Sequence, residues 1–325
     1  MNTLDKIKEP VAGELAQYEE YLRGSLYSDN RLAQDMLDYI FTTRGKAVRP
    51  LLVLLTSAVF NGGIPLPKDS YLAAMLLEMV HTATLVHDDV IDEAFIRRGK
   101  PSVNALWMSQ KAVLIGDFLL AKSFCVGMES GSYGIVRYIT QVMPALCEGE
   151  LTQSEQSDKL EMTRAIYESI IYRKTATLIG TSCGVGAMSA GASGEDVARM
   201  KEMGDSAGMA FQIKDDILDY KPSTGKPLCG DLRERKITLP LLAVLEKSSP
   251  AEKKHIIGLL SGVRGKPSNA DKLYDIVMTR GGLDMAAKVM DEYVDKAVAL
   301  LHRCPPSPYR DSLENLFHYI ASRDM

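Results

Sequence analysis

The chain has 325 residues, 46% of them hydrophobic, so it is long and apolar enough to bury a substantial core. Its 42 acidic residues outnumber its 38 lysines and arginines, and a net charge of −4 excludes the overall basic footprint of a nucleic-acid-binding protein. Five cysteines without a C-x-x-C pair support neither a disulfide framework nor a thiolate zinc site, which favours a reducing cytoplasm.

No stretch of the chain predicts a membrane span. The best apolar run, residues 51–60, is about half as long as the roughly twenty residues that cross a bilayer. The first fifteen residues lack the continuous apolar core of a signal peptide. We therefore expect a soluble, cytoplasmic protein.

Apolar residues recur at intervals of three and four along most of the chain, which is the period of a helix, and few segments alternate as strands do. Gly, Pro and Asn gather between the periodic segments, at residues 61–70, 97–104, 189–195 and 221–231, but no break is long or biased enough to be an interdomain linker. The sequence predicts an all-α protein with a single domain over residues 1–325. In chain order, the predicted helices cover residues 3–24, 30–42, 47–60, 69–93, 106–128, 133–156, 161–189, 194–220, 237–247, 250–262, 270–280, 283–303 and 308–322.

The stretch VHDDVIDEAFIRRGK, residues 86–100, concentrates charge of both signs at the end of a predicted helix. Asp88 and Asp92 are four residues apart and share a helix face, whereas Asp89 lies about 100° round. Like charges one turn apart repel, so something positive should compensate them. Arg97 and Arg98 follow directly.

A second stretch, FQIKDDILDY at residues 211–220, repeats the spacing with Asp215, Asp216 and Asp219. A solvated acidic helix end explains one such cluster adequately, but two copies favour function. Mg²⁺ binds through one or two carboxylates while phosphates and waters complete its octahedron. Two clusters that face one another across a cavity would suit a bridged diphosphate, and arginine would bind its remaining oxygens.

Other basic residues stand in short motifs. Each of them alone is explained by a solvated surface charge, but together with the aspartate clusters they favour a site for phosphate groups. They are Lys46 and Arg49 in RGKAVRP, Lys174 beside Thr175 in YRKTAT, and Lys226 and Lys236 in GKPLCGDLRERKITLP.

The ordered set G-K-x-x-R-P, H-x-x-x-x-x-x-D-D-x-x-D, R-R-G, K-T, Q-x-x-D-D-x-x-D and G-K…G-D-L…K-x-T-L-P resembles the trans-polyprenyl diphosphate synthases, over roughly residues 40–245. This combination in fixed order is specific, although no single piece of it is. The resemblance implies a large all-α bundle around a central cavity, of the isoprenoid synthase type, and usually a homodimer. Its activity would be to join an allylic diphosphate head to tail with isopentenyl diphosphate, using three Mg²⁺ ions per active site.

The resemblance also implies a role for each matched residue. The direct metal ligands would be Asp88, Asp92 and Asp215, with support from Asp89, Asp216 and Asp219. The allylic diphosphate would be bound by Arg97, Lys174, Lys226 and Lys236. Isopentenyl diphosphate would be bound by Lys46, Arg49, His81 and Arg98. The catalytic residues would be Lys174, Thr175 and Gln212, the last two placing dipoles near the allylic cation.

His81 precedes Asp88 by about two helical turns and so shares its face, which supports its assignment to the site. The remaining histidines are expected to have structural roles: His87, His255, His302 and His318.

Product length is predicted from the residues just before the first aspartate cluster. In the family that the chain resembles, a large aromatic residue four or five positions before the first aspartate stops growth early. Here these positions are Thr84 and Ala83, both small, with Val80 one turn below. We expect a long product near octaprenyl diphosphate, made from farnesyl or geranylgeranyl diphosphate for quinone side chains. Small residues that merely pack, and a short-chain product, are the alternatives.

Two other protein classes fit parts of the sequence. A di-iron bundle uses paired E-x-x-H motifs, here Glu78 with His81 and Glu252 with His255, but the second pair is expected in an exposed first turn after the N-cap Ser249. A non-catalytic subunit of a heteromeric synthase would lack charges that are all present here. Release of a lipid product would allow peripheral membrane contact.

The chain departs from the family pattern at two positions. Arg44 and Arg235 stand where glycine is common. Neither change removes a matched functional side chain, so it is the local loop geometry that they put in question.

Overall fold

The structure is a computed structural model that describes residues 3–43, 45–222 and 228–323. The described residues are mostly helical, with one sheet of two short strands, so the all-α prediction is confirmed. The chain divides into two compact units. The first comprises Met1–Gln141, Thr181–Lys201 and Cys304–Leu313, and the second Val142–Gly180, Glu202–Arg303 and Glu314–Met325. Such a division does not count domains, and the single domain over 1–325 stays a prediction.

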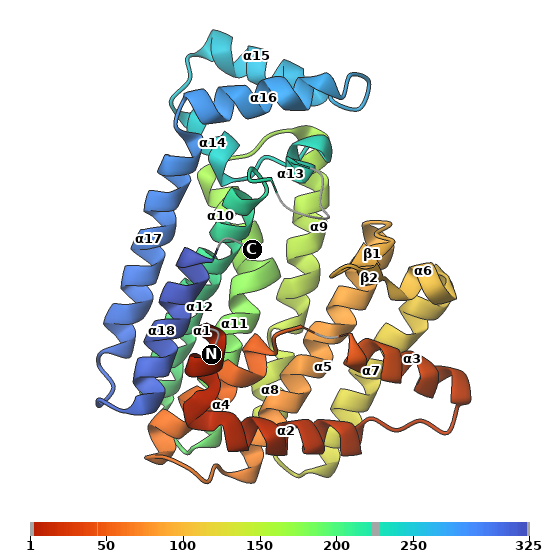
Figure 1. Cartoon of the computed structure of the whole chain (residues 1–325), viewed down its shortest axis with the longest axis vertical. Helices are drawn as coiled ribbons and strands as arrows, with labels where there is room; N and C mark the ends of the chain where they lie inside the picture. The colour runs from red at the N-terminus through yellow and green to blue at the C-terminus, as the bar shows by residue number, and fades with distance from the viewer. Residues whose placement is uncertain (1–2, 44, 223–227, 324–325) are drawn as a thin grey trace. The chain divides into compact units, whose positions relative to one another are not determined.

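The elements of the first unit follow the chain from its N-terminus (Figure 1). They are α1 (Thr3–Lys8), the 3₁₀ turn η1 (Glu9–Val11), α2 (Ala12–Ser25), α3 (Arg31–Thr42), α4 (Val48–Asn61), α5 (Lys68–Ile91), β1 (Ile96–Arg97), β2 (Lys100–Pro101), α6 (Val103–Trp107), α7 (Ser109–Glu129) and α8 (Tyr133–Thr140).

The second unit contains most of the remaining elements. They are α9 (Met143–Lys159), α10 (Arg164–Ile171), the π-helical segment η2 (Tyr172–Ala176), α13 (Gly230–Arg233), α14 (Leu239–Glu246), α15 (Pro250–Ser261), α16 (Ser268–Thr279) and α17 (Gly282–Leu301). Three helices contribute residues to both units: α11 (Thr177–Ser189), α12 (Gly194–Leu218) and α18 (Pro308–Ser322).

The core of the first unit is built around α5, which packs against α4 and α7 (Figure 1). Every residue of α5 from Ser70 to Val80 is buried, as is every residue of α4 from Pro50 to Ala58. Helices that are apolar all round belong in a core. Close approach depends on small residues: a Cβ at Gly116 of α7 would lie 2.2 Å from Nε2 of His87.

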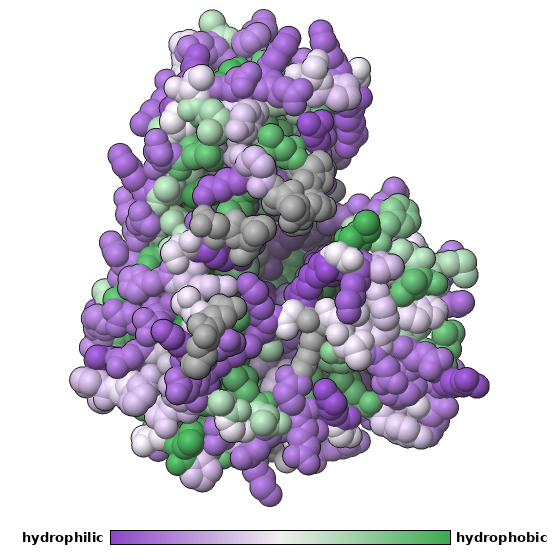
Figure 2. All heavy atoms as spheres, in the orientation of Figure 1, coloured by the Kyte–Doolittle hydropathy of each residue, from purple (hydrophilic) through white to green (hydrophobic). Residues whose placement is uncertain are grey.

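In the second unit, α14 is buried from Leu239 to Leu245 and packs against α17. A Cβ at Gly282, the first residue of α17, would lie 2.6 Å from the carbonyl oxygen of Pro240, so glycine allows this contact. Helices α15 and α16 lie side by side, and hydrophilic residues prevail on their visible face (Figures 1 and 2).

Hydrophobic residues gather on the surface of the first unit around β1, β2 and α6 (Figure 2). Phe95, Ile96, Leu106 and Met108 are exposed there. Among the described residues, no helix combines the length and apolar character needed to cross a membrane.

Prolines interrupt two of the predicted helices. The predicted helix 3–24 is divided by η1, which contains Pro10, and the predicted helix 133–156 is divided into α8 and α9, with Pro144 in the first turn of α9. Proline lacks an N–H and clashes with the preceding turn, so it is tolerated at a helix start and not in its interior.

Two further differences concern backbone geometry. The predicted helix 161–189 contains the π-helical segment η2, and the predicted helix 106–128 begins as the short α6 and restarts after Met108, whose φ is 70°. The hairpin of β1 and β2 was expected only as a break, because strands of two residues are too short to show alternation.

Replacement of Gly186 by alanine should destabilise the protein by about 2 kcal/mol, because the added Cβ would lie 2.5 Å from the backbone oxygen of Val53 on α4. Gly258→Ala in α15 is the matched control. No atom lies within 4 Å of its added Cβ, and the better helix propensity of alanine should stabilise the protein by up to about 1 kcal/mol. Urea unfolding measures both. A Gly186→Ala midpoint equal to that of Gly258→Ala would contradict this packing.

Candidate functional site

The first aspartate cluster lies at the C-terminal end of α5, in the first unit. Asp88 and Asp89 are in the last turn, and Asp92 is the C-cap, its N–H bonded to the carbonyl oxygen of Asp88 at 2.8 Å. Glu93 then takes a left-handed conformation with a φ of 50°, which ends the helix and directs the chain into the hairpin. The hairpin therefore carries its arginines back beside the aspartates.

Arg97 neutralises the central aspartate of this cluster. Its Nε lies 2.8 Å from each oxygen of Asp89, and its Nη2 lies 2.7 Å from Oδ1. The carboxylate of Asp89 is buried, and hydrogen bonds between a guanidinium and a carboxylate are about twice as strong as those between neutral groups. Asp88 is half-buried and Asp92 exposed, so these two side chains reach solvent.

Arg98 occupies a strained turn. Arg98 and Gly99 have φ values of 54° and 75°, as a two-residue hairpin turn requires, and a left-handed conformation costs about 1–2 kcal/mol for a residue other than glycine. Two hydrogen bonds to backbone carbonyl oxygens hold the hairpin. The hydroxyl of Tyr39 on α3 donates to the carbonyl oxygen of Pro101 at 2.6 Å, and Nδ2 of Asn104 donates to the carbonyl oxygen of Asp89 at 3.1 Å.

A basic pocket lies between α3, α5 and the hairpin. Glu78, His81, Asp89, Arg97 and Arg98 are among the residues that line it. The sequence motifs predicted four of these five, and Glu78 appeared only as part of an iron motif. The pocket therefore combines three cationic or imidazole side chains with two carboxylates.

His81 and Arg49 form a pair beside this pocket. Nη1 of Arg49 lies 2.8 Å from Nε2 of His81. Burial, and then the charges of Arg49, Arg98 and Arg97, hold the pKa of His81 well below its usual value, so the neutral ring can accept a hydrogen bond from Arg49. Burial lowers the pKa of Arg49 to about 10, against the opposing effect of Glu78.

The guanidinium of Arg98 packs against the backbone of Gly45. A Cβ at Gly45 would lie 2.5 Å from Cζ of Arg98. Lys46, the next residue, is exposed before the start of α4 and does not line the pocket as described. Arg44 lies outside the described residues.

The second aspartate cluster lies at the C-terminal end of α12, in the second unit, and each carboxylate has a different environment. Asp216 is buried and accepts hydrogen bonds from the Tyr167 hydroxyl at 2.6 Å and from Gln212 Nε2 at 3.1 Å. Burial raises its pKa to about 7 in spite of these donors. Asp219 accepts from the backbone N–H groups of Gly230 at 3.0 Å and Asp231 at 3.1 Å.

Thr175 and Gln212, predicted together from the motifs, are joined by a hydrogen bond of 2.8 Å from the Thr175 hydroxyl to Oε1 of Gln212. Thr175 and Lys174 both belong to the π-helical segment η2, a geometry often found at functional sites. Two glycines allow helices to approach this segment. A Cβ at Gly149 would lie 3.0 Å from the backbone nitrogen of Lys174, and a Cβ at Gly208 would lie 2.5 Å from Cα of Ala176.

The predicted lysines of the second unit pair with glutamates. Nζ of Lys174 lies 2.5 Å from Glu150, and Nζ of Lys236 lies 2.6 Å from Glu234. Lys226 lies outside the described residues. Arg235 has a φ of 64°, which explains physically why glycine suits this position better.

The carboxylates fit a hard divalent cation that takes its other ligands from a substrate. Among residues 3–43, 45–222 and 228–323, no group of three or more His, Cys, Asp or Glu side chains is arranged to hold a metal ion. Asp88, Asp92 and Asp215 nevertheless offer carboxylate oxygens at positions that reach solvent. Mg²⁺ binds in this way, through few carboxylates plus phosphates and waters.

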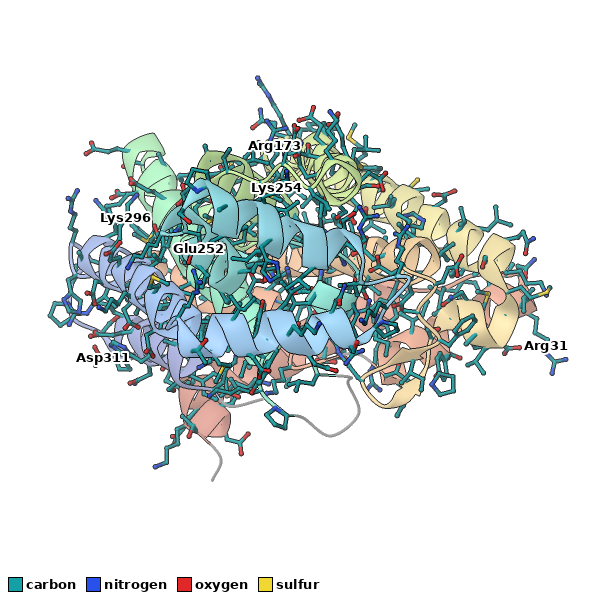
Figure 3. The ribbon with its side chains drawn as sticks, turned by 90° about the horizontal axis from the view of Figure 1, so that it is seen from above. Arg31, Arg173, Glu252, Lys254, Lys296 and Asp311 are labelled. Carbon is teal, nitrogen blue, oxygen red and sulfur yellow. The ribbon has the colours of Figure 1, made fainter. Side chains whose placement is uncertain are left out.

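The iron alternative loses its second motif. As predicted, Ser249 is the N-cap of α15, and Glu252 forms a capping box with it and an ion pair of 2.7 Å with Arg280 (Glu252 is labelled in Figure 3). His255 is exposed, but it lies in the second turn of α15, beyond the first turn in which we expected it. Glu252 therefore serves as a helix cap and not as half of a metal-binding pair.

The other histidines make contacts within their own units. Nε2 of His87 lies 3.2 Å from the Val113 oxygen, and Nε2 of His302 lies 2.7 Å from Glu314. His318 is exposed on α18.

Sequence reasoning missed several partners of the site. Tyr167, Glu150 and Tyr39 stand outside the motifs, and no spacing pattern connects them to the aspartates. Arg323 was also missed: its Nη2 lies 2.5 Å from Oδ1 of Asp215. Its only signal in the sequence is a positive charge near the C-terminal end of the last predicted helix.

Comparisons with known proteins agree with one another. The polyprenyl synthetase family model matches residues 30–277. Octaprenyl diphosphate synthase of Escherichia coli (strain K12) is 31% identical over 99% of both chains. A short chain isoprenyl diphosphate synthase of Methanothermobacter thermautotrophicus is 32% identical over 88% of this chain and 89% of its own. The crystal structure of polyprenyl synthase from Caulobacter crescentus CB15, complexed with calcium and isoprenyl diphosphate, matches with a TM-score of 0.90 at 30% identity, covering 99% of this chain and 98% of that chain.

Proposed function

This chain belongs to the polyprenyl synthetase family, and from that membership we propose that it adds isopentenyl diphosphate head to tail onto an allylic diphosphate, farnesyl or geranylgeranyl diphosphate. The product is a long all-trans polyprenyl diphosphate near octaprenyl. The observation that carries the proposal is the basic pocket beside the first aspartate cluster, where Arg97, Arg98 and His81 gather. Guanidinium groups in such a pocket suit the oxygens of a diphosphate.

The proposed metal ligands are Asp88, Asp92 and Asp215. In this proposal their neighbours Asp89, Asp216 and Asp219 have a supporting role: Asp89 binds Arg97, Asp216 accepts hydrogen bonds from Tyr167 and Gln212, and Asp219 accepts them from backbone amides. Bound Mg²⁺ would neutralise the charge that develops on the departing diphosphate. Three ions per active site remain part of the proposal.

The remaining residues act on substrate groups. Arg97, Lys174, Lys226 and Lys236 hold the allylic diphosphate, and Lys46, Arg49, His81 and Arg98 hold isopentenyl diphosphate. Cleavage of the allylic C–O bond leaves an allylic cation and a diphosphate. The double bond of isopentenyl diphosphate attacks this cation, and the released diphosphate takes the proton that is lost as the new double bond forms.

Thr175 and Gln212 stabilise the allylic cation in this proposal. Their hydrogen bond fixes the oxygen of each side chain, and Gln212 is held a second time by Asp216. Dipoles that are fixed before the reaction stabilise a developing charge without reorganising. Lys174 would act on the other product of the cleavage, by binding the negatively charged diphosphate as it departs.

Product length depends in this proposal on the small residues of α5. Ala83 and Val80 are buried, and Thr84 is half-buried with its hydroxyl donating to the His81 oxygen at 2.8 Å. One open helical turn of about 5.4 Å admits roughly one extended isoprene unit. A short chain synthase and the octaprenyl enzyme have nearly the same sequence identity to this chain, 32% and 31%, so overall identity does not distinguish a short product from a long one. The proposal of a long product therefore rests on these residues of α5.

Three further points belong to the same proposal. A homodimer would cover the exposed apolar residues around the hairpin and α6. We also propose a cytoplasmic location and quinone side chains as the destination of the product. Peripheral membrane contact would assist its release.

The reaction is tested by incubating the purified protein with farnesyl or geranylgeranyl diphosphate, isopentenyl diphosphate and Mg²⁺ and determining the carbon number of the products. We expect a ladder that ends near octaprenyl and disappears with a chelator. A stop at farnesyl or geranylgeranyl length would keep the reaction and refute the long product. No product, with metals and primers varied, would refute catalysis and favour a non-catalytic subunit.

Gly45→Ala should raise the KM for isopentenyl diphosphate, because the added Cβ displaces the guanidinium of Arg98. One charge-assisted contact is worth about tenfold in affinity. Only the end of a flexible side chain must move, so the melting temperature should change little. An unchanged KM would remove Arg98 from the isopentenyl site.

Ala83→Phe should shorten the product to farnesyl or geranylgeranyl length, since a phenyl ring would block growth at this turn. Ala83→Ser is the matched control and should keep the long product. Product lengths are compared at equal substrate consumption. A long product from Ala83→Phe would mean that Ala83 only packs within the core.

A further inference from the structure

Arg323, which follows the last helix, is bound to the first aspartate of the second cluster. Its Nη2 lies 2.5 Å from Oδ1 of Asp215 and 3.2 Å from the backbone oxygen of Phe211. Its Cζ lies 4.1 Å from the centroid of the Phe211 ring. Both side chains belong to the second unit, and no motif of the sequence includes Arg323.

This contact differs from an ordinary surface ion pair. Exposed pairs contribute little because two long side chains must be ordered in water. Here the Arg323 side chain is only 15% exposed, while Asp215 is 41% exposed. The ring and the carbonyl oxygen of Phe211 orient the guanidinium independently of Asp215. A positive charge is therefore fixed beside this carboxylate.

The same carboxylate is a proposed metal ligand. A guanidinium within hydrogen-bond distance takes one lone pair of the oxygen and repels a divalent cation that approaches it. A diphosphate relieves both effects, because its oxygens can accept the guanidinium while they also bind the metal. Metal and diphosphate would then favour each other's binding.

We propose that Arg323 competes with divalent metal for Asp215 and so couples metal binding to the arrival of a diphosphate. This inference rests on the proposed function and assigns Arg323 to its second aspartate site. Arg323 weakens binding of metal alone and contributes to binding of metal with diphosphate. Because coupling between two ligands is reciprocal, its loss must reduce the effect of each ligand on the other.

The test compares Mn²⁺ binding by the full chain and by Arg323→Gln, from the electron paramagnetic resonance signal of free Mn²⁺, with and without inorganic pyrophosphate. Without pyrophosphate, we expect Arg323→Gln to bind Mn²⁺ about tenfold more tightly, since one nearby positive charge is removed at a partly exposed site. With pyrophosphate, this advantage should shrink or reverse.

Two further variants separate charge from packing. Arg323→Lys keeps the charge but loses the planar fork, so its Mn²⁺ affinity should stay near that of the wild type. His318→Gln, on an exposed part of α18, the helix that precedes Arg323, should behave as the wild type does. In Asp215→Asn, the additional change Arg323→Gln should have no effect on Mn²⁺ binding, because the residue through which it acts is gone.

Several outcomes would overturn the proposal. They are equal Mn²⁺ affinities of wild type and Arg323→Gln, equal shifts in Arg323→Lys and Arg323→Gln, and no Mn²⁺ binding by either protein in either condition. The readout is independent of prenyl transfer. Elongation by both proteins with equal Mn²⁺ binding would refute the role of Arg323 alone, whereas the expected Mn²⁺ shift in a chain that forms no product would refute the proposed function alone.

Discussion

Repulsion between carboxylates is the constraint on which the rest of this structure depends. Each D-D-x-x-D cluster brings three carboxylates to one helix end, where they destabilise the fold unless each finds a partner. The partners come from outside the cluster: Arg97 from the hairpin, Tyr167 from α10, and the backbone amides of the first two residues of α13. The hairpin and the segment that contains Gly230 therefore serve as much to neutralise charge as to connect helices.

Two arginines near the aspartate clusters have strained backbone conformations. Arg98 and Arg235 both hold left-handed conformations that glycine would adopt more easily, and each stands beside a residue of the proposed site. Strain of this kind persists only where surrounding contacts overdetermine the conformation. For Arg98 the contacts are known: Tyr39 and Asn104 fix the hairpin, and Gly45 accepts its guanidinium.

Helix positions and aspartate clusters could be predicted from the sequence because both are periodic. Buried α4 and α5 and amphipathic α17 lie within one or two residues of their predicted ranges. Breaks within predicted helices were missed where a single residue decides, as at Pro10 and Pro144. Partners such as Tyr167 and Arg323 were missed because long-range contacts leave no spacing pattern. Pairing of Lys174 with Glu150 likewise depends on how α9 lies against η2.

The π-helical segment has a consequence for how this protein can change. A π turn holds one more residue than an α turn, so it behaves as an insertion that the helix has absorbed. Deleting one residue there would restore a regular helix, but it would also rotate the preceding side chains by about 100° relative to α11. The hydroxyl of Thr175 would then turn away from Gln212, and the hydrogen bond between them would be lost. Gly149 and Gly208 fit the present backbone closely, so this length of η2 should resist insertion and deletion more strongly than the surrounding helices.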